Sequence, residues 1–279
     1  MKPTVLLVAA LCAQAADKSL TFYSSFDGAS DAAFAAGDPK VYTATSYRQR
    51  DDARPGIHNP DVVPAPGEGR FGDALRFKAR NTRAIYYRAD KNVAFDARNW
   101  TGTISFWLKV DPDTELAPGF CDPIQVTDEA FNDAAIWVDF TKDERPRHFR
   151  LGVFGELASW NPKKLDPEKN PDFAKRLVTV TKPPFRGDRW THIVVTHAGL
   201  GGGKGRAKLY LDGRLQGATE TIAEPFTWDL ARAAIRIGVN YVGLFDELAV
   251  FRRELSENDV RNLHRARGPI QVTRRRGTD

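Results

Sequence analysis

Cysteine is scarce in this chain: of 279 residues, only Cys12 and Cys121 carry a thiol. Cys12 falls within residues 1–16, where a short apolar run, Val5–Ala13, and the small residues of Ala13-Gln14-Ala15 predict a secretory signal peptide. The alternative is that these residues form a buried first strand. After cleavage the chain would keep one cysteine, which excludes an internal disulfide. The stability of an exported protein must then come from packing or from a bound metal.

Long hydrophobic runs are also missing. No segment reaches the ~20 apolar residues that a membrane span requires, and the run in the predicted signal peptide is itself too short. The formal net charge is only +5 and the charged residues are scattered, which argues against nucleic acid as a partner. The basic run Arg274–Arg276 falls in residues 269–279, which we expect to form a terminal tail. We therefore expect the mature protein outside the cytoplasm, with no membrane span.

Long helical periodicity is nearly absent, and short strand patterns take its place. Apolar or alternating stretches separated by Gly, Pro, Asp and Asn clusters are typical of antiparallel sandwiches. They cover residues 19–26, 74–77, 84–87, 102–110, 134–140, 148–154, 189–199, 207–213, 233–239 and 243–251. The sequence predicts an all-β fold: a two-sheet antiparallel jelly-roll β-sandwich with one short C-terminal helix, in a single domain over residues 17–268.

The helix is predicted over residues 255–266. Ser256 can cap its N-terminus, and Asp259 occupies the third helical position, as in a capping box. Leu255 before the cap can pack on Val260. We expect the small apolar stripe of this helix to dock on the sandwich.

A hairpin is predicted over residues 208–217, where Asp212-Gly213 accepts the positive φ angles of a type I′ turn. Long segments without a strong strand signal are usually functional or disordered. They cover residues 28–72, 111–120 and 155–182.

Several longer segments follow one another in a characteristic order. They are GRFGDALRFKA (69–79), GTISFWLKV (102–110), DRWTHIVVTHAG (188–199), KLYLDGRLQG (208–217) and IRIGVNYVGLFDELAVFRRELSENDVRNL (235–263). In this order they resemble the laminin-G-like jelly rolls of the concanavalin A-like lectin/glucanase superfamily, in its bacterial branch, over roughly residues 20–267. The resemblance implies two curved sheets packed face to face. It also implies a role in binding carbohydrate or protein and, in many members, one structural calcium at the edge of the sandwich.

The Asp246-Glu247 pair in the last predicted strand raises the question of catalysis. Glycosidases of the resembled fold carry paired carboxylates on one face of a strand, which needs an odd number of residues between them. Adjacent residues of a regular strand point to opposite faces, so we expect this pair not to form such a site. Asp139 and Asp143 have no glutamate at the required spacing, and no Ser/His/Asp or H-E-x-x-H motif occurs. We therefore expect no catalytic residues.

Two other interpretations of the pair stay open. In the first, the resemblance implies that the first and last strands lie side by side, so that Asp27 and Asp246 bind one structural Ca²⁺ at the sheet edge. In the second, Asp246 accepts backbone N–H bonds from a neighbouring loop, and Glu247 pairs with Arg252 or Arg253 at the surface.

Trp160 is the leading candidate for contact with a ligand. It lies in a polar, proline-containing segment, where a tryptophan can offer its ring as a stacking platform for a sugar, and Asn161 beside it is a polar partner. The alternative is that Trp160 folds back and covers an edge of the core. A second candidate is the proline-rich segment 54–69, which contains His58 and Asn59.

The sequence favours a secreted, non-catalytic module that binds carbohydrate or a cell-surface glycoprotein. One alternative is a structural or adhesive extracellular domain with no small ligand. A polysaccharide-active enzyme of the same fold is the third interpretation.

Overall fold

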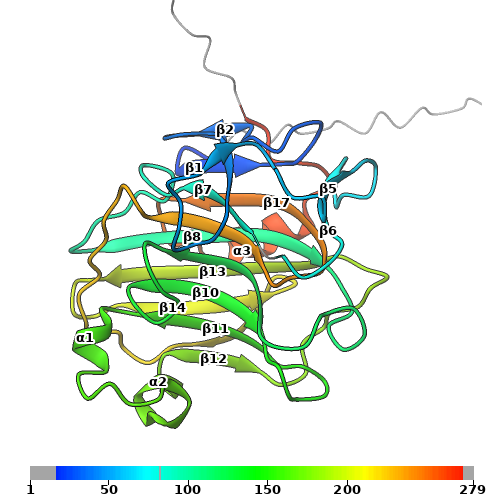
Figure 1. The fold of residues 1–279 in the computed structure, drawn as a ribbon. Coiled ribbons are helices and arrows are strands. Elements are labelled where there is room, and N and C mark those ends of the chain that lie inside the picture. The colour runs from blue at the N-terminus through cyan, green and yellow to red at the C-terminus, as the bar shows by residue number, and fades with distance from the viewer. Residues whose placement is uncertain (1–16, 82, 273–279) are drawn as a thin grey trace, which may run out of the picture.

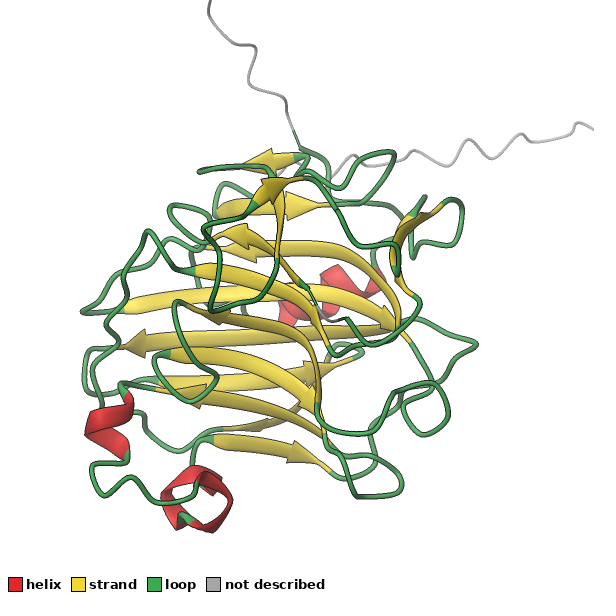
Figure 2. Ribbon diagram, viewed as in Figure 1, coloured by secondary structure: helices red, strands yellow, loops and turns green. Residues whose placement is uncertain are grey.

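The computed structural model of the chain describes residues 17–81 and 83–272 and consists of two antiparallel β-sheets packed face to face (Figure 1). Strands dominate, and the short helices lie at the periphery of the sandwich (Figure 2). The predicted two-sheet jelly-roll fold is confirmed. The predicted signal peptide, residues 1–16, and residues 273–279 of the predicted tail lie outside the described residues.

We call the two layers sheet A and sheet B. Sheet A has the strand order β15 (Arg214–Ala218), β14 (Arg206–Leu211), β13 (Thr191–Leu200), β8 (Trp100–Lys109), β17 (Gly243–Phe251), β1 (Leu20–Ser24) and β2 (Phe34–Ala35). β6 (Ala74–Phe77) pairs with β17 and with β5 (Val62–Ala65). Sheet B has the order β12 (Leu177–Val180), β11 (Phe149–Phe154), β10 (Ala135–Phe140), β9 (Cys121–Thr127), β16 (Ala234–Val239), β7 (Ala84–Arg88), β3 (Val41–Ala44) and β4 (Arg54–Pro55).

The core lies between the two sheets because alternate side chains of each central strand point inward. In β8 the inward side chains include Ile104, Phe106 and Leu108, and in β17 they include Phe245 and Val250. Burial of one such side chain contributes about 1.5–3 kcal/mol relative to leaving it exposed. This repeated burial explains why a chain with a single cysteine among its described residues needs no disulfide to hold the layers together.

The C-terminal helix α3 (Glu257–Arg265) forms as predicted and covers the outer face of sheet A. Ser256 accepts the N–H of Asp259, whose side chain accepts the N–H of Ser256 in return, so the capping box is complete. Val260 and Leu255 pack together against Tyr23 of β1. Residues 270 and 272 pack on the same cluster. The packed domain therefore extends through residue 272, past the predicted boundary at 268.

Two local predictions about sheet A are confirmed. β1 pairs with β17, with Tyr23 opposite Ala249, so the first and last strands are neighbours. Leu211 pairs with Arg214, which leaves Asp212-Gly213 as a two-residue turn with φ angles of 47° and 75°. Positive φ at both turn residues is the requirement of a type I′ hairpin.

Several elements lie where the sequence shows no clear signal. β9 was missed because Pro123 interrupts it, and the register of its pairing with β10 shifts at that proline. Residues 28–72 contain the short strands β2 to β5. Residues 155–182 contain the helices α1 (Leu157–Trp160) and α2 (Pro171–Ala174), a 3-10 turn η1 (Pro167–Lys169) between them, and β12.

Candidate functional site

A row of polar and aromatic side chains crosses the outer face of sheet B. Trp137 pairs with Gln125, Gln125 with Arg236, and Arg236 with Tyr86 across four neighbouring strands. Ile136, which precedes Trp137 in β10, belongs to the core between the sheets. Because strand side chains alternate, the row lies on the opposite, outward side.

The ring of Trp137 lies flat over Gly152 of the neighbouring strand. A Cβ atom at position 152 would come within 2.2 Å of the Trp137 ring, so a side chain there would displace the indole. The lack of a side chain at Gly152 therefore leaves the space that the Trp137 ring occupies on the outer face.

The loop that joins β9 to β10, residues 128–134, is held by an unusual set of hydrogen bonds. Each of its seven carbonyls accepts a bond from a side chain. Arg50 donates to the carbonyl of residue 128 at 3.0 Å, and Arg236 to that of residue 129 at 2.9 Å. The Thr127 hydroxyl lies 3.1 Å from the carbonyls of residues 130 and 133, which share its single proton.

The remaining three carbonyls accept from indole nitrogens of three different elements. The donors and acceptors are Trp137 to Phe131 at 2.6 Å, Trp160 to Asn132 at 2.8 Å, and Trp228 to Ala134 at 2.6 Å. A buried indole usually needs a partner for its N–H, and here the loop supplies all three. The backbone of the loop is therefore fixed by residues outside it.

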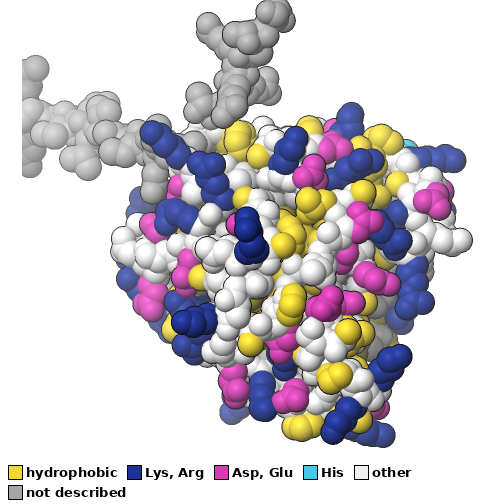
Figure 3. Space-filling view, turned by 90° about the vertical axis from the view of Figure 1, so that its left-hand side faces the viewer, with side chains coloured by type: hydrophobic (Ala, Val, Ile, Leu, Met, Phe, Trp, Pro, Cys, Tyr) yellow, Lys and Arg dark blue, Asp and Glu magenta, His cyan; other side chains and the backbone are white. Residues whose placement is uncertain are grey.

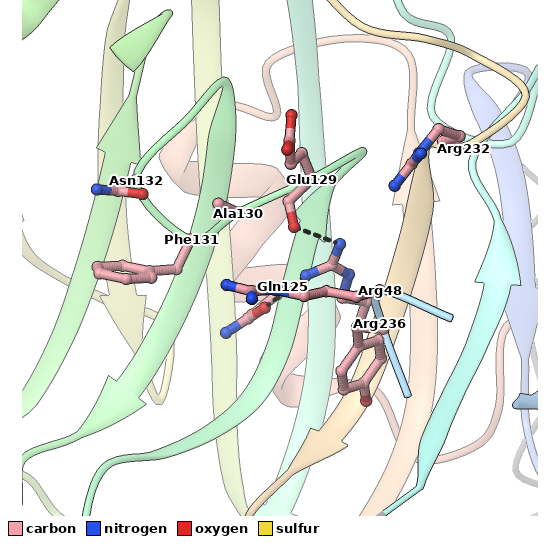
Figure 4. Close-up of a pocket in the computed structure, with 9 residues that line it drawn as sticks. Arg48, Gln125, Glu129, Ala130, Phe131, Asn132, Arg232 and Arg236 are labelled. Atoms are coloured by element: carbon pink, nitrogen blue, oxygen red, sulfur yellow. Dashed lines mark hydrogen bonds between the residues drawn. The ribbon is translucent and has the colours of Figure 1, made fainter. Parts of the chain in front are cut away.

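This loop forms one wall of a pocket of about 560 Å³ (Figure 4). The loop contributes Glu129, Ala130, Phe131 and Asn132, and the other sides come from Tyr47, Arg48, Gln125, Arg232 and Arg236. Phe131 is 42% exposed, so its ring is open to solvent beside the pocket. The volume lies within the range of about 300–1,000 Å³ that is common for ligand sites.

The buried part of the pocket is polar and tightly bonded. Arg236 is 3% exposed, donates to Gln125 Oε1 at 3.3 Å, and lies over the Tyr47 ring at 4.9 Å. Burial lowers the pKa of Arg236 to about 10, so the guanidinium stays charged at neutral pH. The pocket thus offers guanidinium donors, an amide and an exposed ring, a set suited to binding a polar ligand.

A carboxyl pair lies next to Gln125 on the same face. Gln125 Nε2 donates to Asp122, and burial together with the charge of Asp139 raises the pKa of Asp122 to about 8. Asp139 is itself held by Arg150, whose Nε and Nη2 donate at 2.8 and 2.5 Å. The ion pair fixes both side chains in place.

The structure corrects the expectation for Trp160 as a stacking platform. Trp160 is 4% exposed, and its ring packs against Phe154 and Phe173 at centroid distances of 5.2 and 6.2 Å. Its ring face is therefore not open to a sugar, and the alternative of an edge-covering anchor describes it better. The physical reason is that α1 turns the apolar ring inward, where its N–H reaches the loop at Asn132.

Asn161 also serves the protein's own backbone. It is 5% exposed, its Nδ2 donates to the carbonyl of Leu165 at 2.9 Å, and its Oδ1 accepts from the N–H of Leu165 at 3.0 Å. In the proline-rich segment 54–69, His58 similarly bonds to the carbonyl of Pro55, and Asn59 is buried. These side chains shape their own loops.

A bulge in β17 overturns the argument that Asp246 and Glu247 face opposite sides. The pairing of β17 with β8 shifts register between Asp246 and Ala249, and Glu247 has φ of 56°. Phe245 and Leu248 both point into the core, which leaves Asp246 and Glu247 together on the outer face of sheet A. Adjacent residues can share a face only through such an irregularity.

Both carboxyls of the pair are buried and hydrogen-bonded there. Asp246 accepts the backbone N–H groups of Arg70 at 2.6 Å, Phe71 at 3.4 Å and Glu247 at 2.8 Å. Glu247 accepts the Tyr23 hydroxyl at 2.7 Å, in place of the expected arginine. Burial raises the pKa of each carboxyl to about 8. The pair ties the strand to the loop that contains Arg70.

Asp27 contacts the same loop, because its Oδ1 accepts the N–H of Asp73 at 2.7 Å. The two predicted calcium ligands thus lie at one end of the β1–β17 pair. Three amide N–H groups point at the carboxylate of Asp246, and their partial positive charge disfavours a cation at that position. Among the described residues no group of three or more acidic, histidine or cysteine side chains has a metal-binding arrangement. The amide donors at Asp246 fit the structural interpretation, and the calcium site, which would need six to eight oxygens, stays a prediction.

The residues that sequence reasoning missed are Phe131, Arg48, Arg232 and Arg236. Phe131 lies in the sequence FNDA directly before a predicted strand, and an aromatic residue beside Asn and Asp in a turn is a weak signal. Arg236 lies in the middle of the strand pattern AAIRIGV, where a charged residue indicates one solvated or bonded face. Because β9 was not predicted, nothing in the sequence indicated that these residues lie close together in the fold.

Comparison with known proteins agrees with the fold. Domain 4 of AbnA, a GH43 extracellular arabinanase from Geobacillus stearothermophilus, solved in complex with arabinotriose, superposes with a TM-score of 0.56 at 16% identity. The match covers 88% of this chain and 98% of that domain. A mutant of HCR/D superposes with a TM-score of 0.55 at 11% identity, over 90% of this chain but only 52% of that one. At these identities the likeness establishes the fold alone.

No curated protein matched the sequence of this chain. Within residues 17–81 and 83–272, none of the helices combines the length and apolar character of a membrane span. A family model described as the concanavalin A-like lectin/glucanases superfamily matches residues 81–261, which is more than half of the sequence. The match includes β7 to β17 and the start of α3, and with them both walls of the pocket except for Tyr47 and Arg48. The chain belongs to the concanavalin A-like lectin/glucanases superfamily.

Proposed function

We propose that this chain is an extracytoplasmic, non-catalytic carbohydrate-binding module whose ligand lies in the pocket on the outer face of sheet B. The loop 128–134 carries the proposal, because all seven of its carbonyls are bonded to side chains and it holds the exposed Phe131 beside the pocket. A loop that is already fixed loses little conformational entropy when a ligand binds.

The chemistry of the pocket supports a sugar as the ligand. Pyranose rings have an apolar face that packs on an aromatic ring and hydroxyl groups that need donors and acceptors. Phe131 supplies the ring, while Gln125, Asn132 and Arg236 supply polar groups. The complex of the Geobacillus domain with arabinotriose supports a saccharide as the ligand class of this fold.

The proposed location outside the cytoplasm rests on the signal-peptide pattern of residues 1–16. N-terminal sequencing of exported protein should give a chain that begins near residue 16 or 17. Retention of Met1 in the exported protein would contradict that part of the proposal.

The proposal is tested by screening the mature protein against a panel of neutral and acidic oligosaccharides and by titrating the best binder. Phe131→Ala should weaken that binding by about tenfold, since loss of one stacking contact costs roughly 1.4 kcal/mol. Its melting temperature should stay close to that of the parent because the ring is exposed. Leu215→Ala, which removes a comparably exposed apolar side chain from β15 of sheet A, is the matched control and should change neither quantity.

Two outcomes would contradict the proposal. A protein that binds no saccharide of the panel favours the structural or adhesive alternative. Release of reducing ends from a polysaccharide panel favours an enzyme, and substitution of Asp122 would then identify whether the carboxyl pair takes part.

A further inference from the structure

The pocket carries more positive than negative charge. Arg48, Arg232 and Arg236 line it against a single carboxylate, that of Glu129. Arg48 and Arg232 are exposed, whereas Arg236 is 3% exposed. Within the described part of the chain none of the three arginines forms an ion pair with a carboxylate of the protein.

The one acidic side chain of the pocket does not neutralise this charge. Arg236 bonds to the backbone carbonyl of Glu129, and Figure 4 shows the carboxylate of Glu129 directed away from Arg236. The charge of Asp128 attracts Arg236, but Asp128 Oδ2 accepts the N–H of Asp229 at 2.9 Å and forms no ion pair with Arg236. Among the described residues, no carboxylate therefore forms a direct ion pair with Arg236.

Arg50 and Arg232 lie close enough to Arg236 to repel it. Burial is the main cause of the lowered pKa of Arg236, and the positive charges of Arg50 and Arg232 add to it. Arg50 is held by its bond to the carbonyl of residue 128 and lies over the Tyr86 ring at 5.5 Å. An anion placed between these side chains would relieve the repulsion and accept charge-assisted hydrogen bonds.

The face seen in Figure 3 shows Lys, Arg, Asp and Glu side chains interspersed over the surface. Mixed surfaces of this kind place few unpaired like charges together. The net charge of the chain, +5, is small, so it does not by itself explain why three arginines line one pocket.

We propose that the pocket selects saccharides that carry an anionic group, with the sugar ring on Phe131 and the anion held by Arg48, Arg232 and Arg236. The inference rests on the carbohydrate-binding function proposed above and adds its ligand class. A sugar carboxylate and a sugar sulfate ester share the required chemistry, since each presents several acceptor oxygens and a negative charge to guanidinium groups.

Three oligosaccharides on one galactose backbone test the inference: an oligogalacturonide, a sulfated oligogalactoside and the neutral oligogalactoside. Titration of the mature protein should show at least one of the two acidic ligands binding about tenfold or more tightly than the neutral one. Which acidic ligand binds distinguishes a carboxylate from a sulfate. Binding should weaken as NaCl rises, because salt screens the charges at the exposed arginines.

Arg232→Gln and Arg48→Gln should each weaken acidic binding by about tenfold, and should weaken it more than they weaken binding of the neutral oligosaccharide, because only the acidic ligand loses a charge-assisted bond. Arg214→Gln, which removes one equally exposed positive charge from β15 of sheet A, is the control for net charge and should have no effect. Circular dichroism and melting of each variant should match the parent, since both pocket positions are exposed.

The inference is overturned if the neutral oligosaccharide binds as well as both acidic ones, a result that leaves the carbohydrate-binding function standing. It is also overturned if Arg214→Gln weakens acidic binding as much as Arg232→Gln does, because attraction to the overall charge then explains the preference. Failure of all three ligands and of the wider panel contradicts the carbohydrate-binding function itself.

Discussion

Substitution of Trp160 gives the sharpest test of how the site is built. Trp160 is 4% exposed and touches Phe154 and Phe173, so Trp160→Ala removes a buried ring and leaves a cavity. Such a truncation costs about 3–5 kcal/mol of unfolding free energy. For a protein of this size that corresponds to a fall in melting temperature of about 10 °C. Equilibrium unfolding in urea, followed by tryptophan fluorescence and circular dichroism, measures the loss directly.

Trp160→Phe separates packing from anchoring. The phenyl ring keeps most of the contact with Phe154 and Phe173 but cannot donate to the carbonyl of Asn132. An unsatisfied acceptor costs about 1–3 kcal/mol, less than the full cavity, and it loosens the loop next to Phe131. We therefore expect a smaller loss of stability together with weaker saccharide binding. An alanine variant that melts like the parent would refute the reasoning, because the ring would then have to be exposed as the sequence interpretation expected.

Two further predictions concern ionisation and metal. His197 is buried and its pKa is lowered by burial to about 4, so its contribution to stability is present above pH 6.5 and is lost as pH falls toward 4. Between pH 7 and pH 4, the unfolding free energy of the parent, measured in urea, should fall by up to about 3 kcal/mol more than that of His197→Gln. If the unfolding free energies of the two proteins fall in parallel, the lowered pKa of His197 is contradicted. Because amide N–H groups surround Asp246, EDTA should leave the melting temperature unchanged. A fall in EDTA that Ca²⁺ reverses and that Asp27→Asn abolishes would instead establish the calcium site.

Elements whose signals are local were predictable from the sequence. The capping box at Ser256 and the Asp212-Gly213 turn depend on residues within four positions of one another, and the structure has both. The central strand of sheet A, β8, contains a nearly continuous apolar run, which is buried whichever strand lies beside it. Contacts with distant parts of the chain do not change the secondary structure that these local patterns favour, so the fold class could be predicted from them.

The features that decide the site depend on partners far away in the chain. The bulge at Glu247 arises where β17 has one residue more than β8 opposite it, which no pattern within β17 indicates. The direction of Trp160 depends on an acceptor at Asn132, and the sequence context of both positions looks like an ordinary polar loop. Pro123 prevented the prediction of β9. Without this central strand, the sequence could not indicate which side chains share the outer face of sheet B. Sequence reasoning therefore found the sandwich, but it could not show that the ring of Trp160 is buried.

The hydrogen bonds to the backbone of residues 128–134 allow the ligand specificity of the loop to change without a change in its conformation. The side-chain donors to this backbone come from other parts of the chain or from Thr127 at its base. The side chains at positions 131 and 132 are therefore not needed for the conformation of the loop. These two side chains can be exchanged while the loop backbone keeps its conformation, as in proteins whose rigid scaffold carries variable binding loops. A library randomised at these two positions would vary specificity at little cost in stability. The tryptophans and Arg236 are the residues such a library must leave untouched.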